Sequence, residues 1–282
     1  MKYLYWIVIY MGLTNAGMAQ LKLTNEGEKT SVFPLKAKNQ TAIIGAFQDE
    51  IELLKAKMLN RHERHIQGLT FYIGKLKGRQ VVLVRSGIGK VNAAFTTTLL
   101  LEHFRPREVL FTGIAGSVNP DVQPGDIVLA TEVAHHDYGR VQDSGMMVGP
   151  TRDPYQFNEN PTYFHADSSL FLLASFLIKG VKLEKIGDYQ PLVRTGIVAT
   201  GDVLMSSTTG SENLHRTMKA DAVEMEGAAV GQLCYQQKVP FLIIRSISDR
   251  ANHSAQLDMN AYGAIAARNS AALVLAFLER LK

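Results

Sequence analysis

The sequence predicts an α/β protein with one domain, a three-layer αβα sandwich around a mixed central sheet. Short apolar runs of strand length alternate with stretches of helical period, and no internal repeat or linker follows residue 40. The 282 residues are 46% apolar and 20% charged, which is a globular composition. A net charge of +4 without basic runs argues against nucleic acid as a partner.

The first nineteen residues have the features of a secretory signal peptide. Lys2 is the only charge before Lys22, an apolar run of about ten residues follows it, and Gly17-Met18-Ala19 offers a small-residue cleavage site. A bilayer-spanning helix needs about 20 residues, so this run is short for a stable anchor. We expect residues 1–19 to be removed and the protein to be exported, in a periplasm, without stable membrane insertion. The alternatives are an uncleaved anchor and a buried first strand, and without a signal the protein would be cytoplasmic.

The domain is expected to span residues 41–282, after a flexible lead-in at 20–40 that is polar and without period. The apolar run 41–46 predicts a strand, and the change of period at Gly45-Ala46 predicts a helix from residue 48. Apolar runs at 71–76 and 80–85 flank a glycine and predict a hairpin.

The next segments begin with a glycine turn, Ser86-Gly87-Ile88-Gly89-Lys90, which opens a helix that ends near Phe104, before a proline. Buried strands are expected at 108–113 and 125–130, the second after a Pro-Gly turn. Residues 138–165 contain three prolines and several aromatic residues, and predict irregular structure.

The last third of the chain repeats the alternation. Its expected helices are 168–179, 227–237 and 259–281, and its expected strands are 193–200, 223–226 and 241–248. The apolar strand runs require cover on both faces, which the helices provide.

Acidic residues near strand ends are the candidate functional residues, because ligands bind beyond the carboxyl ends of strands in open α/β sheets. Glu50 follows the first strand by one helical turn, Glu224 and Glu226 end another strand, and Asp249 ends the strand 241–248. Taken singly, each has an ordinary alternative. Glu50 could be a surface acid of a helix, Glu224 and Glu226 could lie on a solvated face, and Asp249 could be a helix N-cap. Partial desolvation at the mouth of so apolar a strand would raise the pKa of Asp249.

Four motifs occur together in order and at matching spacing. They are Ile43-Ile44-Gly45-Ala46-Phe47-Gln48-Asp49-Glu50, Ser86-Gly87-Ile88-Gly89-Lys90-Val91, Val223-Glu224-Met225-Glu226-Gly227 and Arg245-Ser246-Ile247-Ser248-Asp249. They resemble the nucleoside phosphorylase and nucleosidase superfamily from about residue 41 to the end. Within it the chain looks most like the 5′-methylthioadenosine/S-adenosylhomocysteine nucleosidases. The resemblance implies a nucleoside phosphorylase-like fold and an N-glycosyl hydrolase that releases adenine from adenine nucleosides.

The same resemblance implies a role for each matched residue. Asp249 would protonate N7 of the leaving adenine, with Ser248 orienting it, while Glu50 would hold and deprotonate the attacking water. Glu226 would accept hydrogen bonds from the ribose hydroxyls. The remaining implied contacts are Met225 on the sugar, Met205 and Leu204 at the base, and Phe47, Ile88 and Met259 around the 5′-alkylthio group. The family commonly has an aromatic residue where this chain has Leu204.

No cofactor and no metal are expected. The pairs His62/His65 and His135/His136 lack carboxylate or Cys partners at ligand spacing and are expected to be solvated. Cys234, the single cysteine, lies in an apolar helix and is expected to be buried and inert. A small purine nucleoside is the expected ligand. The resemblance also implies a homodimer, in which the exposed apolar residues of 138–165 complete the neighbouring site.

Two other functions stay open at this point. A purine nucleoside phosphorylase would bind phosphate, and Arg85 stands before Ser86-Gly87; the phosphorylases, however, usually carry an arginine where this chain has Phe111-Thr112. A nucleoside-binding or storage protein would keep the fold without catalysis. The presence of Glu50, Glu226 and Asp249 favours the hydrolase over both.

Overall fold

The computed structural model describes residues 38–143, 145–177 and 180–281. The expected signal peptide and residues 20–37 of the lead-in lie outside the described residues. The helices are α1 (Gln48–Lys57), α2 (Lys90–Phe104), α3 (Ser168–Leu177), α4 (Thr208–Met218), α5 (Gly227–Gln236) and α6 (Ala255–Arg280). The strands are β1 (Thr41–Gly45), β2 (Leu59–Ile66), β3 (Leu69–Leu76), β4 (Arg79–Arg85), β5 (Glu108–Ser117), β6 (Ile127–His135), β7 (Gly139–Gln142), β8 (Gly145–Val148), β9 (Phe164–His165), β10 (Val193–Thr200), β11 (Ala220–Glu224) and β12 (Phe241–Asp249).

The central sheet is mixed, as expected. Its strands follow the order β11-β10-β6-β12-β5-β1-β4-β3-β2, and β9 pairs with β6. The central strands β4, β1, β5 and β12 are parallel to one another, whereas β6 is antiparallel to β12 and β3 is antiparallel to β4. This arrangement brings the carboxyl ends of β1, β5 and β12 to the same edge of the sheet, where ligands bind in α/β folds.

The sheet also closes on itself, which the sequence did not indicate. Strand β11 pairs with β5 through Ala222 opposite Ser117 and Val223 opposite Gly116. Strands β5, β12, β6, β10 and β11 therefore form a closed ring of hydrogen-bonded neighbours. The ring places the end of β11, with its acidic residues, beside the ends of β5 and β12.

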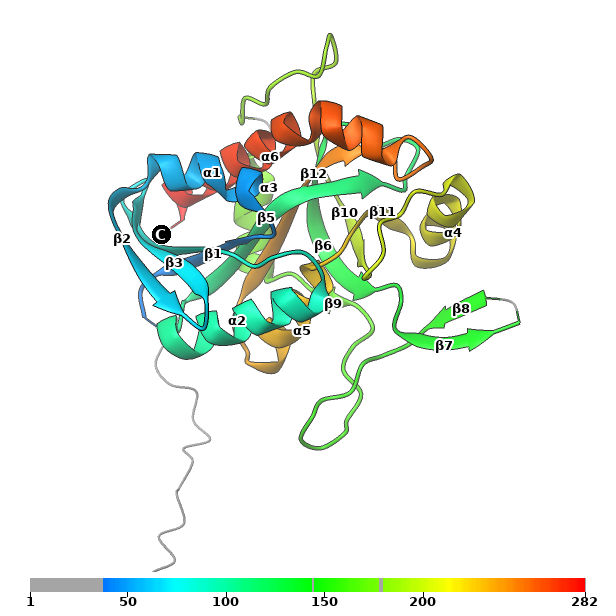
Figure 1. Ribbon diagram of the computed structural model, residues 1–282, viewed down its shortest axis with the longest axis horizontal. Helices are drawn as coiled ribbons and strands as arrows, with labels where there is room; N and C mark the ends of the chain where they lie inside the picture. Colours follow the sequence, from blue (N-terminus) through cyan, green and yellow to red (C-terminus); the bar gives the residue numbers. More distant parts are fainter. Residues whose placement is uncertain (1–37, 144, 178–179, 282) are drawn as a thin grey trace, which may run out of the picture. The chain divides into compact units, whose positions relative to one another are not determined.

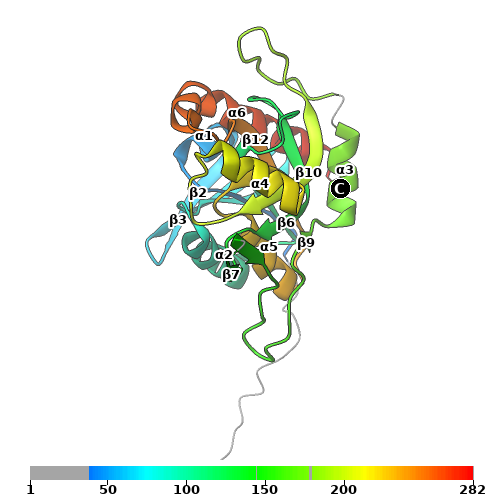
Figure 2. The ribbon, with the colours of Figure 1, turned by 90° about the vertical axis from the view of Figure 1, so that its right-hand side faces the viewer.

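Helices cover both faces of the sheet, which confirms the predicted layers (Figure 1). Helices α1, α3 and α6 pack on one face, and α2 and α5 pack together on the other. Helix α4 packs against β11 (Figure 2). By length and composition α6 could cross a membrane, but 61% of its apolar window is buried inside the fold. Its apolar side chains are therefore part of the core.

The structure corrects several element boundaries. Strand β5 continues through two glycines to Ser117, and β6 continues to His135, because both strands are buried and hydrogen-bonded on either side. Strand β2 and helix α4 were not expected; β2 is exposed along most of its length and lacks an apolar face. The segment 138–165 is less irregular than expected, since it contains the β7–β8 hairpin and β9.

The prediction that His135 and His136 are solvated is wrong. Both are buried, and burial lowers the pKa of each imidazole below its ordinary value. His135 lies at the end of β6 and contacts Gln232 of α5 through Nε2 at 3.1 Å. His62 and His65 are exposed on β2, and Cys234 is fully buried in α5, both as expected.

Candidate active site

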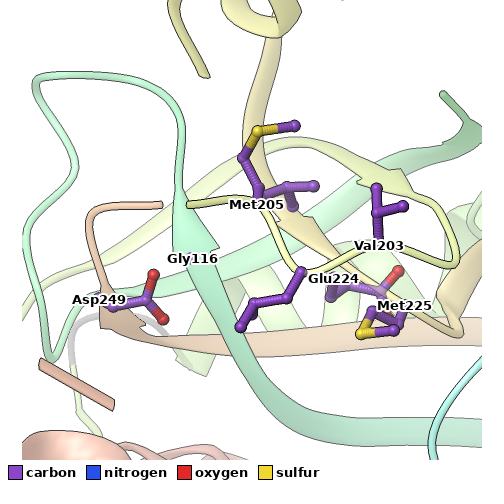
Figure 3. A pocket seen from close by; sticks show the side chains of 8 residues that line it. Gly116, Val203, Met205, Glu224, Met225 and Asp249 are labelled. Atoms are coloured by element: carbon purple, nitrogen blue, oxygen red, sulfur yellow. The ribbon is translucent and has the colours of Figure 1, made fainter. Parts of the chain in front are cut away.

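Four acidic residues from three segments line one cavity of about 210 Å³ at the carboxyl edge of the sheet. Its lining residues are Ala46, Phe47, Glu50, Ile88, Ile114, Ala115, Gly116, Leu204, Val223, Glu224, Met225, Glu226, Ser248, Asp249 and Met259. An adjoining pocket adds Val203 and Met205. Figure 3 shows that pocket, with Asp249 on one side, Met225 on the other and Met205 from the 201–207 segment beside them.

Glu50 is buried because it folds back over the first turn of α1. Its Oε2 accepts hydrogen bonds from the N–H groups of Ala46 and Phe47, and its Oε1 accepts one of 2.8 Å from Ile114 N–H on β5. A glutamate three residues after the N-cap commonly caps the N-terminus of its own helix in this way. Burial raises the pKa of this carboxyl, against the lowering effects of Arg245 and of the three N–H groups. Glu50 is therefore a fixed, desolvated carboxyl and not a surface acid.

Arg245 is fully buried under the carboxylates and was not predicted as a site residue. Its Nη2 forms an ion pair with Glu224 and lies 3.5 Å from Glu226 Oε2, while its Nη1 lies 3.8 Å from Glu50 Oε1. Its guanidinium also stacks on the ring of Phe111, 4.0 Å from the ring centroid. One cation thus faces three carboxylates, so it offsets only part of their charge.

Glu224 supports this arrangement from the end of β11. It accepts hydrogen bonds from the Thr200 hydroxyl and from the N–H groups of Glu226 and Gly227 at the start of α5. These donors fix the position of the Glu224 carboxyl against Arg245. Glu224 and Thr200 are therefore supporting residues that sequence spacing did not reveal.

Glu226 has the most perturbed environment of the acidic group. Its Oε1 accepts a 2.8 Å hydrogen bond from Gly89 N–H. Burial and the charge of Glu224 raise the pKa of Glu226 to about 8, against the lowering by Arg245. The surroundings of Glu226 therefore favour its protonated form in the free protein more than water does.

Asp249 lies at the opposite side of the cavity. Its Oδ2 accepts a 2.7 Å hydrogen bond from the Ser248 hydroxyl, and its Oδ1 accepts one of 2.8 Å from Ala251 N–H. Burial raises the pKa of Asp249 above its ordinary value, as the sequence predicted, although both hydrogen bonds lower it. The alternative of a helix N-cap is wrong, because α6 begins later, at Ala255, after its N-cap Ser254.

Two glycines of β5 create the space for these carboxyls. A Cβ atom on Gly113 would lie 2.1 Å from Arg245 Nη1 and 2.3 Å from Glu50 Oε1. A Cβ atom on Gly116 would lie 2.7 Å from Asp249 Oδ1. Any larger residue at either position would displace a charged group of the site.

The structure brings the ten residues predicted from the sequence to one place. The predicted apolar contacts Phe47, Ile88 and Met259 line the cavity with Ile114, and Leu204 and Met225 line both pockets. Met205 lines only the adjoining pocket. Within the described ranges, no group of three or more His, Cys, Asp or Glu side chains is placed to hold a metal ion.

Comparison with known proteins agrees with the fold. Residues 40–279 match the phosphorylase superfamily. A 5′-methylthioadenosine/S-adenosylhomocysteine nucleosidase of Psychromonas ingrahamii is 41% identical over 242 residues, which are 85% of this chain and 98% of the relative.

Two solved nucleosidase structures are also similar. The Neisseria meningitidis enzyme in complex with methylthio-immucillin-A has a TM-score of 0.75 and 34% identity, and the match covers 86% of this chain and 100% of that one. The Colwellia psychrerythraea enzyme in complex with adenine has a TM-score of 0.76 and 35% identity, and the match covers 88% and 98%.

The fold and the acidic cavity thus define a member of the phosphorylase superfamily. Within that superfamily, the chain belongs to the 5′-methylthioadenosine/S-adenosylhomocysteine nucleosidases.

Proposed function

We propose that this protein hydrolyses the N-glycosidic bond of 5′-methylthioadenosine, S-adenosylhomocysteine or a related adenine nucleoside, giving adenine and a ribose derivative. One observation carries the proposal: a single cavity presents two separate carboxyls, Asp249 from the end of β12 and Glu50 from the first turn of α1, and burial raises the pKa of each. Cleavage of this bond needs a proton for the leaving base and a base for the attacking water.

The proposed steps use these two groups in turn. Asp249 donates its proton to N7 of adenine as the C1′–N9 bond breaks, and an oxocarbenium-like ribose develops. Glu50 takes a proton from water as the oxygen forms its bond to C1′. Proton exchange with solvent then restores a protonated Asp249 and an ionised Glu50. Glu226 faces the ribose, and positive charge on the sugar favours the ionised form of this carboxyl.

The lining of the cavity favours water over phosphate as the second substrate. Among the described residues, the cavity lining includes four acids and no lysine or arginine. Arg245 lies below the cavity and already faces three carboxylates, and Arg85 is exposed outside the lining. A phosphate dianion in this cavity would meet uncompensated negative charge.

The test is incubation of the purified protein with methylthioadenosine, S-adenosylhomocysteine, adenosine and inosine, with and without phosphate. We expect adenine and a free ribose derivative from the 5′-thio substrates, at a rate that phosphate does not change. Strict dependence on phosphate and a ribose 1-phosphate product would identify a phosphorylase. Binding of nucleoside without turnover would identify a binding or storage protein.

We further propose that the protein is a homodimer. Large apolar side chains are exposed at the start of α2, in and beside the β7–β8 hairpin and at 203–204; they are Ile88, Val91, Phe95, Tyr138, Val141, Met147, Val203 and Leu204, of which Ile88 and Leu204 line the cavity. Ile88, which lines the cavity, is 55% exposed, and Val91 in α2 is 78% exposed, and exposed apolar side chains grouped in this way are typical of an interaction surface. A second copy seated here would cover this surface and close the 5′ end of the cavity. Light scattering of a fully active monomer at micromolar concentration would contradict the dimer.

Export is a separate proposal that depends on residues 1–19. Removal of this segment is supported by its N-terminal lysine, its short apolar run and its small-residue cleavage site. Cleavage there would leave Gln20 as the first residue. The first described strand begins at Thr41, so cleavage leaves the described fold unchanged. N-terminal sequencing of protein from fractionated native cells tests this proposal. An intact Met1 in the cytoplasmic fraction would refute it.

A further inference from the structure

Three residues outside the cavity lining link the segments on either side of the cavity. Lys90 is the first residue of α2, Asp137 follows the end of β6, and Asp202 follows the end of β10. None of the three lines the cavity or its adjoining pocket. They lie far apart in the sequence, so their contacts come from the fold.

The contacts among these residues form a closed set. Lys90 Nζ lies 2.6 Å from Asp137 Oδ1 and 3.9 Å from Asp202 Oδ2. The backbone N–H of Lys90 donates to Asp202 Oδ1 at 2.7 Å, and the backbone N–H of Asp202 donates to Asp137 Oδ2 at 2.8 Å. Each residue therefore contacts both of the others. Burial raises the pKa of Asp137, but the bonds from Lys90 and Asp202 outweigh it and hold this pKa below its ordinary value.

Through its neighbour Gly89, Lys90 is connected to Glu226 on the ribose side of the cavity. Gly89, next to Lys90, donates its N–H to Glu226 at 2.8 Å and has φ of +94°. A Cβ atom on Gly89 would lie 3.1 Å from Asp202 Oδ1. The turn is thus held between the carboxyl that faces the ribose and the side chain of Asp202.

Asp202 is connected to the base end of the cavity through the residues that follow it. Asp202 is followed by Val203, Leu204 and Met205, which line the adjoining pocket. Residues 201–207 are neither helix nor strand, and their two ends are fixed: Gly201 N–H donates to the carbonyl of Glu224 at 3.0 Å, and Ser207 is the N-cap of α4. Next to the first of these ends, Asp202 N–H donates to Asp137, and a Cβ atom on Gly201 would lie 2.2 Å from His136 Nε2.

We propose that Lys90, Asp137 and Asp202 are positioning residues that hold the 202–205 segment and the Gly89 turn in the arrangement that binds substrate. This inference rests on the proposed hydrolysis, because that proposal assigns the ribose to the Gly89 side of the cavity and the base to the 202–205 side. Without the Lys90 ammonium the 202–205 segment would sample other positions, and apparent affinity falls by the fraction of molecules that are competent to bind. Saturating substrate restores that arrangement, so the chemical step is retained.

The test compares Lys90→Met with Lys57→Met, which removes an exposed lysine from α1. Loss of one charge-assisted contact predicts a KM for methylthioadenosine about 10-fold higher in Lys90→Met. We expect its kcat to stay within about 3-fold of wild type, because no group that touches the reacting atoms changes. Lys57→Met should match wild type in both constants. An unchanged KM, or a fall in kcat at constant KM, would overturn the proposal.

A double-mutant cycle tests whether the three residues act together. If they do, Lys90→Met combined with Asp137→Asn should raise KM no more than either change alone. Independent effects that multiply would contradict the proposal. If Lys90→Met does not fold, Asp202→Asn replaces it, since this change keeps the size of the side chain and removes its charge. An unchanged KM in folded Asp202→Asn would also contradict it.

Adenine binding by calorimetry separates this inference from the proposed function. It requires no turnover, and the positioning role predicts weaker adenine binding in Lys90→Met by the same factor as the KM change. Wild-type protein that binds adenine but does not hydrolyse nucleosides would remove the proposed function. Equal adenine affinity in wild type and Lys90→Met would remove the positioning role.

Discussion

Ser248 donates a hydrogen bond of 2.7 Å to Oδ2 of its neighbour Asp249. Because Ala251 N–H donates to the other carboxyl oxygen, the orientation of this acid is fixed from both sides. Both bonds favour the ionised form, whereas burial favours the protonated form and prevails, so that the pKa is raised. An acid balanced in this way can release its proton to a bound base without moving.

Replacing Asp249 by asparagine should abolish most turnover while retaining binding. The amide keeps the shape of the side chain, and the Ser248 hydroxyl can rotate to accept from it, but the amide has no acidic proton to give. General acid catalysis contributes about 10²- to 10⁴-fold, so we expect kcat to fall by that range. Steady-state kinetics and adenine binding measure the two effects. Turnover of methylthioadenosine at the wild-type rate would exclude Asp249 as the acid.

Glu50→Gln should remove hydrolysis and also weaken the fold. Each oxygen of Glu50 accepts backbone N–H bonds, so an amide NH₂ would face a donor at one of them. An unsatisfied buried donor costs about 1–3 kcal/mol, which would appear as a lower midpoint in urea unfolding. Loss of activity in protein that remains folded supports the proposed role at the water. A folded and fully active variant would argue against it.

The stability of the protein should depend on pH through Glu226. The pKa of this carboxyl rises from 4.5 to about 8 on folding, so between these values the folded state holds a proton that the unfolded chain releases. This contribution to stability is fully present below about pH 4.5 and is lost as the pH rises through about 8. Thermal unfolding between pH 5 and 8 should show a steeper decline for wild type than for Glu226→Gln. Parallel profiles would contradict the raised pKa.

Leu204→Phe should strengthen adenine binding. Leu204 is 52% exposed and lines both pockets, so a larger ring can lie over the base without displacing a core residue. Aromatic contacts add about 0.5–1.5 kcal/mol beyond area burial, which corresponds to a roughly 2- to 10-fold lower Kd. Calorimetry with adenine measures this change, and Leu204→Met is the matched control without a π face. Equal affinity of the two variants would show that this position does not contact the base.

The sequence predicted the parts of the fold that have strong local signals. Apolar runs such as 41–46 and 241–248 are buried strands, and the glycine turn before α2 begins its helix where expected. Strand β2 was missed because its polar and charged side chains show no apolar alternation; it joins the sheet through its pairing with β3. Pairing at the edge of a sheet depends on the neighbouring strand and leaves little mark on the sequence.

Site residues that lie in sequence motifs could be predicted, whereas contacts between residues of distant segments could not. Glu50, Glu226 and Asp249 lie in recognisable motifs, and they share one cavity. The central place of Arg245 was not predicted, because its partners Glu50, Glu224 and Glu226 come from other segments. Local spacing also gave no sign that Lys90 would meet Asp137 and Asp202.

The pairing of β11 with β5 has a mechanical consequence. The strand that ends in Glu224 and the strand that bears Asp249 belong to one closed ring, so neither can shift without breaking ladder hydrogen bonds elsewhere in the ring. Backbone amides of β5 and β12 should therefore exchange with deuterium slowly, and those of residues 201–207 should exchange quickly. We therefore expect substrate entry and product release to involve the 201–207 segment more than the strands beneath the cavity.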